Sequence, residues 1–235
     1  ADITIPNGIT EIRYRVFKDN LLASITIPSS VTSIGDSAFG NNLLTSVTIP
    51  DSVTSIGDEA FGDNQLTSFT IPNKSVSYGR GVFIRNKITE FTIPPKMISI
   101  PRDFLRENRL TSIIIPESVR RIDDTAFANN ELNSVILPDS IIIFGFGIFF
   151  DNELTSFDLP DYLTTIPSGI VGNNKLTSVM LSNSITSIGG SAFYGNQLTD
   201  IIIPESVTSI GDSAFGNNLL TSVTIPNSVT SICFK

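Results

Sequence analysis

The stretch that decides the fold is LTSVTIPDSVTSIGDEAFGDNQ, residues 44–65. Variants of this unit follow one another along the whole 235-residue chain without insertions. Its proline recurs at 6, 28, 50, 72, 94, 116, 138, 160, 204 and 226, always 22 residues apart except for one step of 44, where Ser182 stands in the missing place. A fixed period of this length is typical of a solenoid, in which each unit buries its apolar edge against its neighbours.

The apolar residues of the unit indicate a strand in every turn. Leu44, Val47 and Ile49 are spaced L-x-x-L-x-L, and the last two share one face because side chains alternate along a strand. The proline that follows has no N–H and ends the strand. We therefore predict a mainly β repeat solenoid of about eleven coils of 22 residues. Its parallel sheet should be formed by these segments, with Val47 beside Phe69 on the neighbouring strand.

A phenylalanine column fills the opposite side of the predicted core. Phe61 is the representative residue, and its equivalents are missing at Leu105 and Val171. At those two places the preceding residue is enlarged, to Phe104 and Ile170. Because protein cores are closely packed, we interpret the exchange as volume that is moved within the turn.

An asparagine column is present in all ten full units. An amide in this position can bond to the backbone of its own turn and of the next turn. We predict that Asn108 and its equivalents are buried and form such a ladder, because ten equivalent catalytic sites in one chain are implausible. The members of the column are Asn20, Asn42, Asn64, Asn86, Asn108, Asn130, Asn152, Asn174, Asn196 and Asn218.

Composition argues against catalysis. The chain has no histidine, which removes the commonest general base and metal ligand. The single cysteine, Cys233, can form neither an internal disulfide nor a multi-thiolate zinc site. Gly79-Arg80-Gly81 and Gly145-Phe146-Gly147 lack the third glycine of a nucleotide-binding motif, so we interpret them as repeat bends. We predict a protein that is not an enzyme and holds no cofactor.

Charge and hydropathy exclude two further classes of function. The net charge of −8 argues against binding to nucleic acid. The longest nearly apolar run, residues 141–150, is too short to cross a bilayer, so this segment is not expected to insert into a membrane. Asp36, Asp58 and Glu59 could hold a weak calcium ion, but we favour a solvated loop face and predict no metal site.

The pattern LTSVTIPxSVTSIGDxAFxxN, with its P…IG…AF…N spacing, resembles the BspA-like leucine-rich repeats over the whole chain. The resemblance implies one leucine-rich-repeat domain over residues 1–235, which we expect to belong to a longer protein. It also implies an extracellular or cell-surface location and adhesion to host matrix proteins or to another cell surface. No signal peptide is visible, since the chain opens inside the repeat pattern. Family members commonly carry cysteine where this chain has Asn20, Asn42 and their equivalents. Because this chain has asparagine there, no cysteine ladder is expected.

Basic residues gather in the middle of the chain. Ten of the fifteen Lys and Arg residues lie between 74 and 121, against four acidic residues, so that stretch carries +6 (ten minus four). Like charges on adjacent turns repel, so the layout favours an anionic partner, with charge clustering by drift as the alternative. The candidate ligand-binding residues in this set are Lys74, Arg80, Lys96, Arg102, Arg120 and Arg121.

A second divergence is apolar. The outward strand position, threonine from Thr4 to Thr92, becomes aliphatic further along the chain and returns to threonine at Thr224. Such a stripe suits a protein ligand, unless a neighbouring domain or chain covers it. We place the candidate site on residues 74–202, where both divergences occur. Its remaining members are Ile114, Ile136, Asp158, Met180 and Ile202; Ile142, Ile143, Phe146 and Phe150 also replace polar or small residues.

Three functions remain open at this point. The leading hypothesis is an extracellular module for adhesion or protein binding. A passive spacer or surface-layer element is the first alternative, and uniform repeats would be its mark. The second alternative is ice or polysaccharide binding through Ser-x-Thr rows such as Ser46 and Thr48, although ice binding requires a flat array that the aliphatic residues interrupt.

Overall fold

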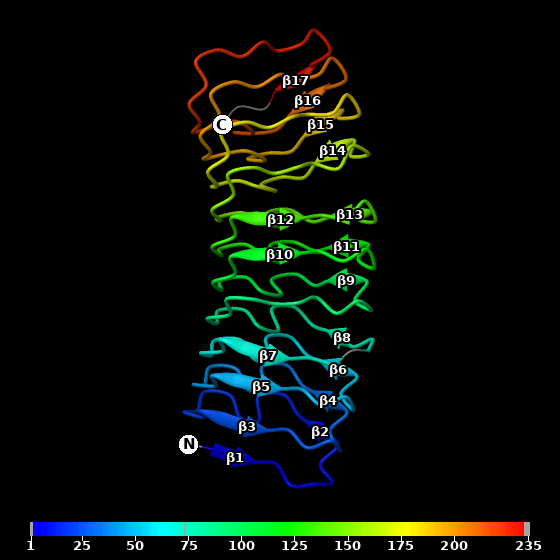
Figure 1. Cartoon of the computed structure of the whole chain (residues 1–235), viewed down its shortest axis with the longest axis vertical. Coiled ribbons are helices and arrows are strands. Elements are labelled where there is room, and N and C mark those ends of the chain that lie inside the picture. Colours follow the sequence, from blue (N-terminus) through cyan, green and yellow to red (C-terminus); the bar gives the residue numbers. More distant parts are fainter. Residues whose placement is uncertain (1, 73, 233–235) are drawn as a thin grey trace.

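The computed structural model describes residues 2–72 and 74–232, and within them the chain forms one continuous stack of parallel turns (Figure 1). Strand β1 lies at one end of the long axis and β17 at the other. Paired residues are one period apart, as Val47 is from Phe69, so the predicted parallel solenoid is confirmed. No helix occurs in the part of the chain that the structure describes. Cys233 lies outside the described residues.

The first strand line contains the predicted strands and ends before the proline of each turn. Among the described residues, its strands pair as β1 with β3, β5 with β7 and β10 with β12. The six strands are β1 (Asp2–Thr4), β3 (Ser24–Thr26), β5 (Ser46–Thr48), β7 (Ser68–Thr70), β10 (Ser112–Ile114) and β12 (Ser134–Ile136).

The second strand line follows the proline corner and is more continuous than the first. Its sheets run β2-β4-β6-β8, β9-β11-β13 and β14-β15-β16-β17. The strands are β2 (Glu11–Ile12), β4 (Ser33–Ile34), β6 (Ser55–Ile56), β8 (Ser77–Tyr78), β9 (Ser99–Ile100), β11 (Arg121–Ile122), β13 (Ile143–Phe144), β14 (Thr165–Ile166), β15 (Ser187–Ile188), β16 (Ser209–Ile210) and β17 (Ser231–Ile232).

The sheet that we predicted from the 44–49 type segments is thus present but divided. Aromatic rings explain part of the division. Phe69 and Phe91 occupy the position of Val47, and the two rings stack with centroids 4.8 Å apart. Residues 90–92, which include Phe91, form no strand next to β7. Residues 178–180 and 200–202 also form no strand, and ring size does not explain those interruptions.

Both interruptions of the second strand line coincide with a proline. In a regular turn the glycine N–H donates to the preceding turn, as Gly57 N does to Ile34 O at 2.8 Å. Pro101 and Pro167 occupy this glycine position and have no N–H, so the bond is lost where β8 meets β9 and where β13 meets β14. Glycine suits most of the other turns because a Cβ at Gly57 would clash with Asp36 Oδ1.

The phenylalanine column packs along the interior as predicted. The rings of Phe39 and Phe61 stack with centroids 5.2 Å apart. Where the column is interrupted, Phe104 and Leu105 are both fully buried. The Phe104 ring packs edge-on against Phe83 at 5.6 Å instead of stacking. The displaced volume therefore stays in the core, in a different orientation.

The asparagine ladder joins each turn to the one before it. The Asn108 amide nitrogen donates to the carbonyls of Leu105 at 3.2 Å and of Arg106 at 3.3 Å in its own turn, and of Phe83 at 3.0 Å in the preceding turn. Its oxygen accepts from Ile88 N at 3.1 Å. The eight central members of the column are buried, whereas Asn218 is half-buried and Asn20 is exposed. The predicted ladder bonds are confirmed from Asn42 to Asn218, although Asn218 is only half-buried, whereas the exposed Asn20 donates to carbonyls of its own turn.

Candidate ligand-binding surface

The aliphatic column, Ile114, Ile136, Asp158, Met180 and Ile202, faces solvent on the first strand line. Alternation along the strand sets this direction, since Ile113 and Ile115 beside Ile114 are buried. The exposed fractions are 65% for Ile114, 59% for Ile136, 91% for Met180 and 85% for Ile202, and Asp158 is also exposed. Large apolar side chains gathered in this way are a typical feature of contact surfaces.

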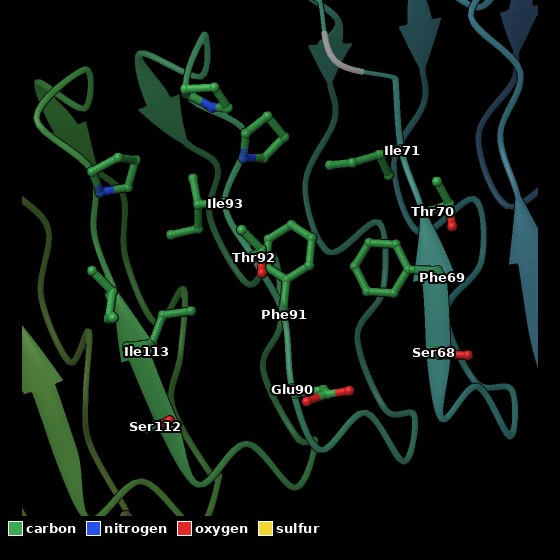
Figure 2. A pocket seen from close by; sticks show the side chains of 14 residues that line it. Ser68, Phe69, Thr70, Ile71, Glu90, Phe91, Thr92, Ile93, Ser112 and Ile113 are labelled. Atoms are coloured by element: carbon green, nitrogen blue, oxygen red, sulfur yellow. The ribbon is translucent and has the colours of Figure 1, made fainter.

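Two grooves indent the first strand line beside this column. The Phe91 groove, of about 800 Å³, lies between residues 68–71, 90–95 and 112–114 and is drawn in Figure 2. Phe69 and Phe91 stack within it, and Ile114 is among its lining residues. The groove opens where residues 90–92 leave the sheet.

The Asp158 groove, of about 630 Å³, collects most of the aliphatic column. Ile136, Asp158 and Met180 come from three successive turns and all line it, together with half-buried apolar residues such as Val179. Ile202 belongs to the next turn and does not line this groove. The structure therefore brings together three of the five column residues, and Asp139 and Asp161 add two further carboxylates to the groove lining.

An arginine cluster surrounds one buried carboxylate, that of Asp103, whose side chain is 5% exposed. Arg80 and Arg102 place their Nε atoms 3.5 Å and 3.4 Å from Asp103 Oδ2, and Arg106 Nη1 lies 3.4 Å from Oδ1. The Thr125 hydroxyl donates to the same Oδ1 at 2.6 Å. A buried carboxylate requires such partners. Arg80 and Arg102 are therefore paired with a carboxylate of the chain itself, although about half of each side chain remains exposed.

The free positive charge is smaller than a count over residues 74–121 indicates. Several of the carboxylates that pair with these arginines lie just outside that stretch. Glu59 is 3.6 Å from Arg80, and Asp124 is 3.9 Å from Arg102. Asp63 accepts a hydrogen bond from Arg85, and this bond, together with the Asp63 charge, outweighs desolvation and raises the pKa of the guanidinium. Asp123, which also lies just outside the stretch, pairs with Arg121.

Lys74 and Lys96 lie apart from this network, in the basic groove. This groove, of about 430 Å³, is lined by residues 74–78, 96–99, Pro94, Pro101 and Asp123. Among the described residues, neither of these lysines forms an ion pair. Burial raises the pKa of Tyr78, another residue of the groove lining, to about 12.

The basic and apolar halves of the predicted site lie on neighbouring faces of the solenoid. Pro94 lines both the Phe91 groove and the basic groove and separates them. Within one turn, Ile114 ends β10 and Arg121 begins β11, and these strands belong to different sheets. The guanidinium of Arg120, on the second face, donates to the carbonyls of Glu117 and Val119.

The acidic positions considered for calcium have a structural role. Asp36 Oδ1 accepts from Asp58 N at 2.9 Å, and Asp58 Oδ1 accepts from Arg80 N at 2.8 Å. Each carboxylate thus caps a backbone N–H of the following turn. Over the residues that the structure describes, no group of three or more candidate metal ligands is found.

The sequence pattern described as the BspA type leucine rich repeat region matches residues 10–133 and 120–235, with six copies. The chain belongs to this family. Its BspA-type repeats are similar to a solved leucine-rich-repeat protein from Bacteroides ovatus, with 24% identity over 97% of this chain and 67% of the other, and a TM-score of 0.69. No curated protein gives a significant match.

Two further solved structures share the fold of this BspA-type chain. A leucine-rich cell surface protein from Faecalibacterium prausnitzii is 24% identical, covers 100% of this chain and 87% of its own, and has a TM-score of 0.59. The pneumococcal vaccine antigen PcpA is 20% identical over 99% of this chain and 75% of its own, with a TM-score of 0.73. At these identities the likeness establishes the solenoid fold alone.

The structure also reveals site residues that the sequence analysis did not name. Ile98 is exposed in the column that contains Arg120 and Ile142. That column reads threonine in most regular turns, as at Thr54, so the departure was visible in the sequence. Asp103 was less visible, because its burial depends on arginines from its own and the preceding turn.

No described helix is both long and apolar enough to span a bilayer.

Proposed function

We propose that this BspA-type solenoid is an extracellular adhesion module that binds a protein ligand on its first strand line. The observation that carries the proposal is the aliphatic column, in which Met180 and Ile202 are 91% and 85% exposed. Threonine occupies this position in the regular turns, so the apolar residues are not required by the fold. A ligand that covers them would gain about 25 cal/mol for each Å² of apolar surface removed from water.

The Asp158 groove supplies specificity to this contact. Its apolar lining residues would contact a ligand side chain, while the carboxylates of Asp139, Asp158 and Asp161 would attract a complementary cation. The absence of histidine from the chain favours binding over catalysis. The likeness to a cell surface protein and to a vaccine antigen supports an exposed location. Host matrix protein is the ligand class that the family implies.

A threonine-restoring variant tests the proposal. Ile136→Thr, Met180→Thr and Ile202→Thr together return the column to the regular repeat and should leave the fold intact. We expect this triple variant to dissociate at least about tenfold faster from decellularised matrix on a biosensor, because buried apolar contacts act mainly on the dissociation rate.

The control changes the same kind of residue in regular turns, as Thr26→Ser with Thr48→Ser, and should bind as the parent does. Equal dissociation of the parent and the triple variant would contradict the proposal and favour a passive spacer. Loss of binding in the control alone would move the site to the regular turns.

A further inference from the structure

The two lysines of the basic groove occupy a position that serves the fold in most other turns. There a serine hydroxyl donates to a carbonyl of the preceding turn, as Ser118 does to Met97 O at 2.9 Å and Ser140 to Val119 O at 2.8 Å. Even Tyr162 makes this bond, to Ile141 O at 2.6 Å. Lys74 and Lys96 replace the hydroxyl-bearing residue in two consecutive turns. The hydrogen bond of the repeat is therefore absent at both positions, where Lys74 is half-buried and Lys96 is exposed.

The groove coincides with an opening in the backbone ladder. It lies where β8 and β9 fail to pair because Pro101 has no N–H. In regular turns Thr54 N donates to Thr32 O at 2.8 Å, but the equivalent groups, Ile98 N and Val76 O, make no such bond. Within the described part of the chain, the groove thus offers an unbonded backbone donor and acceptor beside two ammonium groups that form no ion pair. The serine hydroxyls of Ser75, Ser77 and Ser99 add further polar contacts.

We propose that the basic groove binds an acidic polysaccharide, a linear sugar chain that carries sulfate or carboxylate groups. Lys74 and Lys96 occupy equivalent positions in two successive turns, and both line the groove. Their charges therefore form a row along the solenoid axis, which suits a linear polyanion. Sugar hydroxyls would pair with the serine side chains and with the open backbone groups. Asp123, the one carboxylate that lines the groove, is itself paired with Arg121.

Two observations favour a polysaccharide over an acidic peptide. A peptide strand inserted between β8 and β9 would require the turns to separate, but Gly81 N donates to Arg102 O at 2.9 Å close by and holds them together. In addition, planar carboxylates are matched by arginine forks, and Arg80 and Arg102 are already bonded to carboxylates of this chain. The free cations of the groove are lysines, which are point charges without that geometric demand.

Restoring serine gives a direct test. Lys74→Ser with Lys96→Ser returns both turns to the repeat pattern, so the melting temperature should be retained or raised. We expect the parent to bind a sulfated dextran oligosaccharide, and the double variant to bind it about tenfold more weakly, as measured by calorimetry. The affinity of the parent should also fall as salt is added, because exposed charges are screened.

A charge-matched control separates the groove from overall charge. Lys87→Gln with Arg109→Gln removes two unpaired cations elsewhere on the turn and introduces the residue found at Gln65. It should change the affinity by less than about twofold. No binding by the parent, an equal loss in the control, or equal binding of a poly-glutamate peptide would each overturn the proposal. The threonine-restoring triple variant should bind sulfated dextran normally, so this inference and the proposed protein ligand can fail separately.

Discussion

Val31–Pro50 and Val207–Pro226 have the same sequence but different structures. In the first copy Val47 and Ile49 are buried, and β5 pairs with β7. In the second copy, Val223 and Ile225 are 44% and 39% exposed, and residues 222–224 form no strand. The amino acids are identical, so the difference comes from the neighbouring turns. A turn of this solenoid acquires its structure from the turns stacked on it.

The comparison predicts its largest effect for the same isoleucine in the two copies. Ile49→Ala should lower the free energy of unfolding by about 2–5 kcal/mol, since the side chain is buried among other core residues. Ile225→Ala should cost about 1 kcal/mol, because much of that side chain is already in water. Denaturant unfolding of both variants measures the difference. Equal losses would show that the neighbouring turns do not decide the contribution.

The asparagines of the two copies should differ by less. Asn42 is buried and Asn218 is half-buried, although their amide groups make the same kinds of bond. Asn42→Ala should cost about 1–3 kcal/mol, because it leaves buried backbone groups unpaired. Asn218→Ala should cost less, since water reaches those groups. Thermal melts of the two variants test this, and a larger loss at Asn218 would contradict it.

The smallest effect concerns a position that is isoleucine in both copies, Ile34 and Ile210, and tyrosine in the central turn. Burial raises the pKa of Tyr78 to about 12 from 10.0. Because the folded state keeps the phenol neutral, stability should be unaffected below pH 10 and should fall as the pH rises from 10 to 12. The loss should reach about 1–2 kcal/mol after allowance for partial exposure. Tyr78→Phe should remove this part of the alkaline dependence in denaturant unfolding.

The sequence predicted the solenoid because its period is unbroken and every inward column has one physical requirement. The asparagine ladder and the transfer of volume to Phe104 followed from the same columns. The division of the first strand line could not be predicted, because Val179 and Ile201 fit the strand pattern and still lie in unpaired segments. Strand pairing depends on the separation of whole turns, which a column of similar residues does not encode.

The candidate site was predictable in part, because the repeat pattern also identifies the outward-facing positions. Outward positions such as Met180 are exposed as the strand alternation requires. Ion pairs were harder to predict, because Arg80 and Asp103 come from different turns and neither follows the repeat. Counting charges along the chain therefore grouped Arg80 with Lys74, although only the lysine lacks an ion pair within the described part of the chain.

The asparagine ladder has a consequence for how such a chain can change in evolution. From Asn42 to Asn218, each amide bonds to backbone groups at fixed offsets in two successive turns, as Asn108 does to Phe83 and Arg106. Duplication or deletion of one whole period keeps every donor opposite its acceptor, whereas a gain or loss of a few residues shifts one turn and breaks the bonds on both sides of it. The length of the protein should therefore change by whole turns. Identical segments such as Val31–Pro50 and Val207–Pro226 are the expected result of such duplications.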